Sequence, residues 1–289
     1  MSDSVSQVTP EVPPRSIRQR ATIPLIIVAA IFIIVPFFTW YGTWFGRSLT
    51  DEKISEYLAD EKNPRHVQHA LAQIAERLEK NDANVRRWYP QIIALANSNL
   101  VELRSNVAWV MGKDNQSTEF HETLKRLAAD KDPLVQRNAA VALVAFNDSS
   151  GRDILRSMLQ PYRLTVANDG ELKSVLKEGV SVKVGMMLAR MSVGENQLLE
   201  VRSPLPGEIQ QVVAQAGTTL KAGDTLLFLS PDSGTVWEAL RALYFVGQRD
   251  DLALVEPYVN GVSKMPGEVK QQAALTAKAI QTRAANSQK

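Results

Sequence analysis

The chain has 289 residues, of which 45% are hydrophobic and 22% are charged, and its formal net charge is +2. This length and composition predict a globular protein of two or three domains with sizeable cores. The small net charge argues against a nucleic-acid binder, which usually carries a strongly basic domain. The sequence contains no cysteine, so disulfides, thiolate nucleophiles and Cys-ligated metals are excluded.

The N-terminal 45 residues predict a tail followed by a membrane span. Residues 1–20 are polar and contain three prolines, which predicts a disordered segment. Residues 21–45 carry no charge and end in a cluster of aromatic residues, which is typical of a transmembrane helix that meets the interface at that end. Pro36 would kink or end this helix. The alternative is a buried helix of a soluble domain, but the polar flanks and the aromatic cluster favour the membrane.

Positive charges predict the orientation of this span. Arg15, Arg18 and Arg20 precede it, whereas Arg47 on the other side is offset by acidic neighbours. This distribution favours a cytoplasmic N-terminus and an exported body. No small-residue cleavage site follows the apolar run, so an uncleaved anchor is expected. The predicted location is the bacterial inner membrane, as a single-pass protein with a periplasmic body.

Residues 50–161 show a weak helical repeat. Residues 103–111 match residues 135–143 at an offset of 32, and a looser copy covers residues 66–74. A period of this length with two helices per unit predicts an α-solenoid. The sequence motif that begins at Asp132-Pro133 resembles HEAT-like repeats of the phycobilisome-lyase type. The resemblance implies a protein-binding surface more often than an enzyme.

Further helices are predicted from apolar periodicity and capping signals. They cover residues 51–58, 88–96, 119–129, 151–159, 235–245, 251–259 and 269–283. Residues 232–286 therefore continue the helical pattern after an interruption. Insertion of the interrupting segment into one solenoid is the economical interpretation, because the last helices would then stack on those before Tyr162. The alternative is a segment that separates two helical pieces.

The segment that interrupts the helical pattern, residues 162–231, contains a short motif repeated in tandem. Gly170 and Gly207 are 37 residues apart, and the pairs Gly179/Gly217 and Gly185/Gly223 are 38 apart, within short alternating apolar runs. Glycines that interrupt alternating apolar runs in this way are typical of short strands joined by tight turns. The tandem pattern resembles the lipoyl/biotinyl-like domain, or barrel-sandwich hybrid, which also occurs in membrane fusion proteins.

The resemblance implies two activities that the residues argue against. A carrier domain of this family needs a lysine at the hairpin that joins its halves, but the predicted turn Gly194-Glu195-Asn196 has none, and no lysine occurs between Lys183 and Lys221. A typical membrane fusion protein has a long helical hairpin between the halves, and here the connection is short. The predicted fold class is therefore multidomain α + β, with a transmembrane helix, a HEAT-like solenoid and an inserted all-β domain that lacks a cofactor site.

The histidines do not predict a metal site. His66 and His69 lie three residues apart on one predicted helix, but His121 is distant in sequence. A solvated helix face is the favoured interpretation of the first two. The acidic pair Asp250-Asp251 is predicted at a helix N-terminus, where negative charge is favourable.

No catalytic motif is present in the sequence. It contains no nucleophile elbow, no phosphate-binding glycine loop and no dinucleotide fingerprint. Trp88, Trp109 and Trp237 are predicted to pack in the core or between repeats. We therefore expect no catalytic residue, no cofactor and no metal.

The expected function is non-enzymatic. The sequence favours a membrane-anchored scaffold or assembly factor that binds envelope or inner-membrane proteins, and it does not indicate an oligomeric state. The alternative is an accessory periplasmic adaptor of an inner-membrane transporter. An enzyme of the lyase type would require a bound chromophore.

Overall fold

The computed structural model of the protein describes residues 27–36, 48–194, 197–262 and 264–286. The chain forms two compact units, residues 1–50 and residues 51–289. In the first unit residues 27–36 are helical, and their aliphatic and aromatic side chains are exposed. None of the helices within the described ranges is both long enough and apolar enough to cross a bilayer. The predicted tail, residues 1–20, and both ends of the predicted span lie outside the described residues.

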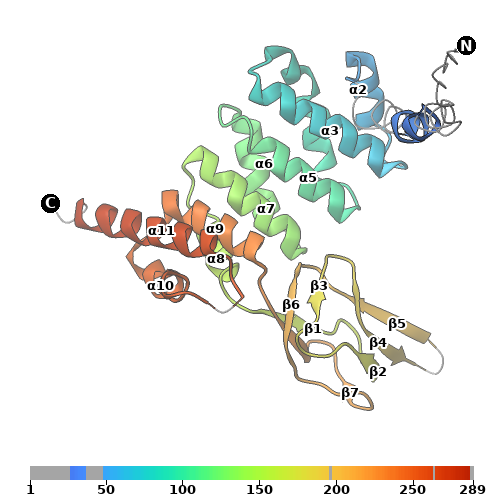
Figure 1. Ribbon diagram of the computed structural model, residues 1–289, viewed down its shortest axis with the longest axis vertical. Coiled ribbons are helices and arrows are strands. Elements are labelled where there is room, and N and C mark those ends of the chain that lie inside the picture. The colour runs from blue at the N-terminus through green and yellow to red at the C-terminus, as the bar shows by residue number, and fades with distance from the viewer. Residues whose placement is uncertain (1–26, 37–47, 195–196, 263, 287–289) are drawn as a thin grey trace, which may run out of the picture. The chain divides into compact units, whose positions relative to one another are not determined.

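The second unit begins with an array of short helices (Figure 1). Its α-helices are α2 (Asp51–Leu58), α3 (Pro64–Glu79), α4 (Tyr89–Leu95), α5 (Val101–Met111), α6 (Thr118–Ala128), α7 (Pro133–Leu143) and α8 (Arg152–Ser157), with 3-10 turns η1 (Ala83–Trp88) and η2 (Val144–Phe146). The predicted helix at residues 88–96 begins one residue later, because Pro90 stands in its first turn and η1 precedes it. The other predicted helices in this region are confirmed within a few residues.

Local signals account for the helix starts. The Ser117 hydroxyl accepts a hydrogen bond from the Phe120 amide at the start of α6, and the Asp132 carboxylate accepts one from the Leu134 amide at the start of α7. These caps satisfy amides that have no partner inside the helix. Pro133 follows Asp132 at the first helical position, where its missing N–H is not needed.

The array has two layers of helices. Helix α3 packs against α5, and α5 packs against α7, so these three form one layer, while α4 and α6 belong to the other. Large side chains fill the space between the layers, among them Trp88, Phe120 and Leu124, each at most 1% exposed. The Trp88 indole N–H donates to the Ser55 hydroxyl at 2.9 Å, which satisfies its one polar group.

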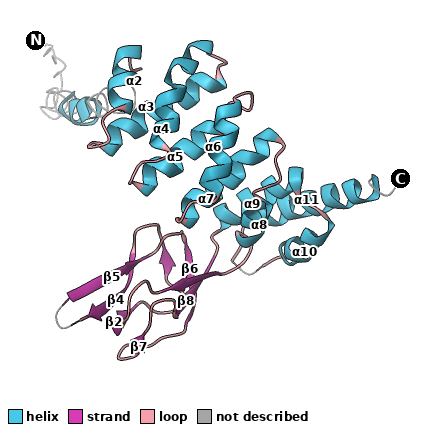
Figure 2. Cartoon of the chain, turned by 180° about the vertical axis from the view of Figure 1, so that it is seen from behind, coloured by secondary structure: helices cyan, strands magenta, loops and turns pink. Residues whose placement is uncertain are grey.

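An all-β module follows α8 (Figure 2). Its strands are β1 (Tyr162–Thr165), β2 (Gly170–Val175), β3 (Ser181–Val182), β4 (Met187–Val193), β5 (Gln197–Arg202), β6 (Gly207–Val212), β7 (Thr219–Leu220) and β8 (Thr225–Ser230). They form two four-stranded antiparallel sheets with the orders β1-β8-β6-β3 and β5-β4-β2-β7. A core of aliphatic side chains from both sheets lies between them.

The backbone repeats the duplication seen in the sequence. In one half the Gly179 amide donates to the Ile209 carbonyl at 2.8 Å, and in the other the Gly217 amide donates to the Leu172 carbonyl at 2.7 Å. Both glycines have positive φ, +81° and +90°, which side chains disfavour. Each half thus completes its hydrogen bonding with a strand of the other half, so neither half is a complete unit alone.

Close backbone approach explains a second pair of glycines. A Cβ atom at Gly207 in β6 would lie 2.3 Å from the Ser230 carbonyl oxygen, and one at Gly170 in β2 would lie 2.5 Å from the Ser192 carbonyl oxygen. These distances are far below van der Waals contact. Both positions therefore require glycine for the adjacent strands to pair.

The chain then returns to helices, which share a core with those before the β module. Helices α9 (Ser233–Val246), α10 (Leu252–Asn260) and α11 (Gly267–Asn286) follow, with the 3-10 turn η3 (Arg249–Asp251) after α9. Buried side chains of α9, α10 and α11 pack with Leu155, Met158 and Leu159 of the α8 region. The Tyr258 hydroxyl donates to the Leu159 carbonyl at 2.8 Å. The prediction that the last helices stack on those before Tyr162 is confirmed.

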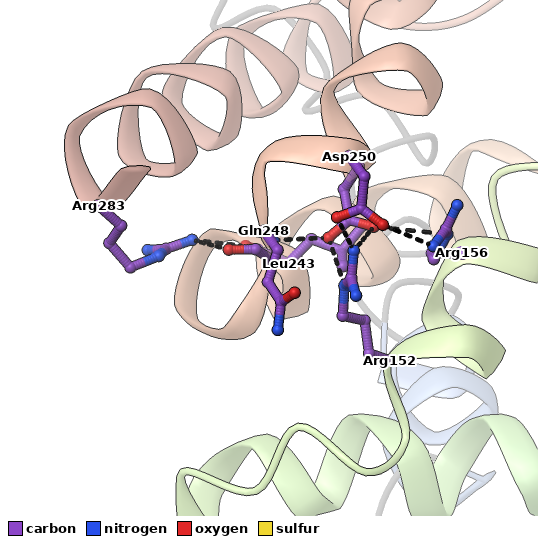
Figure 3. A network of polar contacts seen from close by, with 8 residues as sticks. Arg152, Arg156, Leu243, Gln248, Asp250 and Arg283 are labelled. Carbon is purple, nitrogen blue, oxygen red and sulfur yellow. Dashed lines mark hydrogen bonds and ion pairs between the residues drawn. The ribbon is translucent and has the colours of Figure 1, made fainter. Parts of the chain in front are cut away.

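An ion-pair network joins the two helical segments (Figure 3). The Arg152 guanidinium contacts both carboxylate oxygens of Asp251, at 2.8 and 2.9 Å, and it also contacts Asp250. Arg156 lies 3.1 Å from Asp250. Asp251 is fully buried and also accepts from the Gln248 amide at 2.7 Å. Asp250-Asp251 thus begins a helix as predicted, but its main partners come from nearly 100 residues away.

The β module meets the array at two polar positions. Arg137 of α7 is only 7% exposed, and burial lowers the pKa of its guanidinium to about 10, while nearby Tyr162 and Asp232 oppose that shift. In the loop between α10 and α11, the Lys264 ammonium lies 2.7 Å from the Glu208 carboxylate in β6. The Lys264–Glu208 ion pair thus joins the module to the helices that follow it, and Arg137 lies near Tyr162, where β1 begins.

Candidate functional site

The hairpin that would bear a cofactor in a carrier domain joins β4 to β5. Gly194, its last described residue before the turn, has a φ of +62°. Glu195 and Asn196 lie outside the described residues. In the second half the corresponding position is where the chain joins the helical array, since β8 ends at Ser230 and β1 begins at Tyr162. The hairpin and the attachment to the helices are therefore equivalent ends of the duplicated module.

The histidines at residues 66 and 69 do not form a solvated face. His69 is buried, at 6% exposure, and burial lowers the pKa of its imidazole, with the charge of His66 acting in the same direction. Its Nε2 lies 3.0 Å from the Gln73 amide. His66 stacks on Tyr57 with ring centroids 4.2 Å apart. The prediction was wrong for His69, because α2 packs over this side of α3.

His121, the third histidine, also makes contacts that stabilise the fold. His121 Nε2 lies 2.7 Å from the Asp148 carboxylate, and its ring stacks on Phe146 with centroids 4.9 Å apart. Within the described part of the chain, no three histidine or acidic side chains gather closely enough to hold a metal ion. The histidines therefore make contacts between neighbouring elements and do not converge on one site.

Two adjoining cavities form a groove across the layer of α3, α5, α7 and α9. The larger has a volume of about 510 Å³ and lies over α5, α7 and α9. The smaller, of about 310 Å³, lies over α3 and α5. Trp109 lines both, so they are neighbouring parts of one surface. We call this surface the groove, and its lining includes Gln68, Asn106, Trp109, Asn138, Arg241 and Phe245.

Trp109 is exposed in the middle of the groove. Its exposed fraction is 49%, so of the two predicted settings the core was wrong, and Trp109 lies between the helices of neighbouring repeats. The reason is helical spacing: Leu103, Val107 and Val110 are fully buried on one side of α5, and Trp109, two residues after Val107, falls on the opposite side. Trp88 is buried as predicted, and Trp237 is partly buried against the core of the last helices.

Lys113 packs against one face of the Trp109 indole. The Lys113 ammonium lies 4.8 Å from the indole centroid and 2.6 Å from the Glu79 carboxylate of α3. Lysine over an indole ring is attractive because the ring face carries negative charge density. The indole is thus oriented but still half exposed to a ligand.

The far wall of the groove comes from α9. Phe245 is 58% exposed and makes an edge contact with Tyr244 at 5.0 Å. The Arg241 guanidinium lies 5.4 Å from the Trp237 ring, and within the described ranges it has no carboxylate in ion-pair distance. Desolvation raises the pKa of the Glu238 carboxyl although the residue keeps solvent contact, and the charge of Arg241 opposes that shift.

The floor of the groove depends on close approach of α5 and α7. A Cβ atom at Gly112, at the end of α5, would lie 2.9 Å from the Ala142 Cβ atom of α7. Asn138 of α7 donates to the Ser105 hydroxyl of α5, which ties the same two helices together. Sequence periodicity could have identified this surface, because Trp109 and Val141 are 32 residues apart and occupy equivalent repeat positions.

Comparisons with known proteins support part of this description. A family model for HEAT repeats matches residues 89–167, which confirms the predicted repeats over that stretch. No curated protein matches the chain. Among solved structures, an engineered protein is similar over 80% of this chain and 79% of its own, with 14% identity and a TM-score of 0.41. A single-chain, multi-domain long-chain acyl-CoA carboxylase is similar over 41% of this chain and 12% of its own, with 15% identity and a TM-score of 0.24.

Both TM-scores are below 0.5, so neither likeness defines the fold of the whole chain. The chain consists of a HEAT-repeat helical region and a β-sheet module of two four-stranded antiparallel sheets.

Proposed function

We propose that this protein is a non-enzymatic, membrane-anchored scaffold or assembly factor that binds protein partners in the cell envelope. The observation that carries the proposal is the groove across α3, α5, α7 and α9, with the half-exposed indole of Trp109 at its centre. Tryptophan, tyrosine and arginine dominate binding energy at protein interfaces. Trp109 and Arg241 line the groove, and Tyr244, which is 38% exposed, contacts Phe245 of its wall.

A role for the β module follows from its interlocked halves. We interpret it as a barrel-sandwich hybrid of the lipoyl-like type, because the two halves exchange equivalent backbone hydrogen bonds and repeat the same strand order. The hairpin sequence Gly194-Glu195-Asn196 offers no lysine for lipoate or biotin. Its proposed role is therefore to extend the binding surface of the solenoid, with no cofactor.

The anchor rests on the apolar segment, residues 21–45. Residues 27–36 within it are helical and expose apolar side chains such as Phe32, at 76%. Together with the arginines that precede the segment, this supports a single span in the bacterial inner membrane with a periplasmic body. A phosphatase reporter fused after Lys289 tests the topology. Activity is expected on the periplasmic side, and a reporter active only in the cytoplasm would overturn the assignment.

Capture of proteins from solubilised membranes tests whether the groove binds a partner. Tagged protein should retain one or more envelope proteins that Trp109→Ala loses. The matched control is Leu275→Ala, because Leu275 is an equally exposed apolar residue on α11 outside the groove, at 54%. If the wild-type protein captures nothing that the Trp109→Ala variant loses, the groove does not carry the function.

The duplicated β module favours one alternative, an accessory periplasmic adaptor of an inner-membrane transporter. The same capture experiment separates the two. A transporter together with an outer-membrane channel among the captured proteins would favour the adaptor, and a partner set without them favours the scaffold.

A further inference from the structure

The groove contains hydrogen-bonding groups that nothing within the described ranges satisfies. The side-chain amides of Gln68 on α3 and Asn106 on α5 are half-buried at its edge, and neither has a hydrogen-bond partner in that part of the protein. The Arg241 guanidinium on α9 likewise lacks a carboxylate partner there. These groups keep contact with solvent, and a ligand that pairs with them gains the modest net energy of each hydrogen bond that it forms.

The dimensions of the groove suit a chain and not a compact small molecule. It crosses four neighbouring helices, and helices pack roughly 8–10 Å apart, so it runs for roughly 25–30 Å. An extended chain rises about 3.3 Å per residue, so roughly eight or nine residues fill that length. An extended backbone also presents alternating N–H and C=O groups along its edges, which side-chain amides of asparagine and glutamine can meet as both donor and acceptor.

The charges and aromatic rings of the groove define the side chains that such a segment would carry. Trp109 and Phe245 offer exposed ring faces for an apolar side chain. Lys113 is already paired with Glu79, whereas Arg241 has no carboxylate within ion-pair distance in the described ranges. Glu238, one turn earlier on α9, also lines the groove and interacts with the charge of Arg241 at longer range. A planar guanidinium held over the Trp237 ring binds a carboxylate with two parallel hydrogen bonds.

We infer, building on the proposed scaffold function, that the groove binds an extended acidic segment of a partner protein, about eight or nine residues long. An apolar side chain of the segment lies against Trp109 and Phe245. A glutamate or aspartate of the segment pairs with Arg241, and the backbone pairs with Gln68 and Asn106.

Selection from a display library of random nonapeptides tests this inference. The target is the full chain in detergent, and each enriched peptide is then measured by fluorescence anisotropy. Enriched peptides should carry an acidic residue at a fixed distance from an aromatic or large aliphatic residue. Trp109→Ala should weaken the binding of these peptides at least tenfold, as truncation of a central aromatic anchor typically does.

The charge-reversed variant Arg241→Glu makes the test specific. It should reject the acidic peptides and enrich for basic ones. The matched control is Arg126→Glu on α6, because Arg126 is exposed on the other layer of the array, and it should leave both preferences unchanged. Unfolding curves of all variants show whether each is folded.

Two results would overturn the inference. One is that no peptide is enriched over a blank surface, and the other is that Arg241→Glu keeps the preference for acidic peptides. The outcome that rejects this inference differs from the outcome that rejects the proposed scaffold function. If envelope proteins are captured through Trp109 but no extended peptide binds, the scaffold stands and the extended segment does not.

Discussion

The helical array and the β module are stabilised in different ways. The array depends on side chains that meet across long sequence distances, such as the Arg152–Asp251 ion pair and the core shared by α8 with α9, α10 and α11. The β module depends on its backbone, because its halves exchange hydrogen bonds at Gly179 and Gly217 and pair closely at Gly207. Loss of an ion-paired side chain should therefore affect the array most, whereas added atoms at glycines should affect the module most.

The largest effect is expected from Asp251→Ala in the array. Removal of this carboxylate leaves Arg152 without its paired acceptor at a buried position, where breaking an ion pair costs about 3–5 kcal/mol. Because Arg152 and Arg156 keep some solvent contact, we expect a loss of about 2–3 kcal/mol in the free energy of unfolding. Chemical denaturation measures it. Asp153→Ala, an exposed acid on α8, is the control and should change stability little.

The next effect is expected from Gly207→Ala in the β module. The added Cβ would clash with the Ser230 carbonyl, and overpacking of this kind costs about 1–3 kcal/mol. Hydrogen exchange should show faster exchange in β6 and β8 and little change in the array. Gly267→Ala, where an added Cβ meets nothing within 4 Å, should be nearly neutral. Equal loss of protection in both regions would mean that array and module unfold as one cooperative unit.

Acid should weaken the array through Asp130. Burial raises the pKa of this carboxyl, but hydrogen bonds from Arg104 and the Asp132 amide outweigh it, so its pKa lies below the ordinary value of 3.8. A carboxyl with a lowered pKa in the folded state contributes stability at pH values above its unfolded pKa, and that contribution is lost as pH falls through the folded value.

We therefore expect the free energy of unfolding to fall as pH drops below about 4, by on the order of 1 kcal/mol from this pair after solvent screening. Denaturation curves at pH 6 and pH 3 measure the change. Asp130→Asn should be less stable at pH 6 and should show a shallower dependence on pH. An unchanged slope would show that other carboxyls dominate acid unfolding.

The smallest effect on stability is expected from Trp109→Ala. Half of this side chain is exposed, so the free energy of unfolding should change by no more than about 0.5 kcal/mol, as for surface substitutions. Capture of the partner should nevertheless be lost. A large drop in stability would show that the indole belongs to the packing of the array, as the sequence alone predicts.

Element positions were largely predictable, because each depends on nearby residues. Capping by Asp132 and the apolar spacing of residues 135–143 define α7. The duplicated glycines predict the turns and strands of the module, since positive φ at Gly179 and Gly217 is a local requirement. HEAT-like repeats were recognised from the same local periodicity.

The candidate site was not predictable to the same degree, because exposure depends on which helices become neighbours. The indole of Trp109 is left outside the core, while His69 is covered by α2. The sequence also placed Asp250-Asp251 correctly at a helix start but gave no sign of Arg152 as its partner. The groove itself arises only when α9 packs beside α7.

The sequence by itself determined the order of elements, the duplication within residues 162–231 and the lack of a lysine at the module's hairpin, because periodicity, turn chemistry and residue identity are local properties. Tertiary structure alone decided that helices on both sides of the module close into one array. It also decided that Trp109, Arg241 and Phe245 line one groove. The physical reason is that burial and electrostatic pairing depend on distances in space, which residues nearly 100 positions apart acquire only by packing.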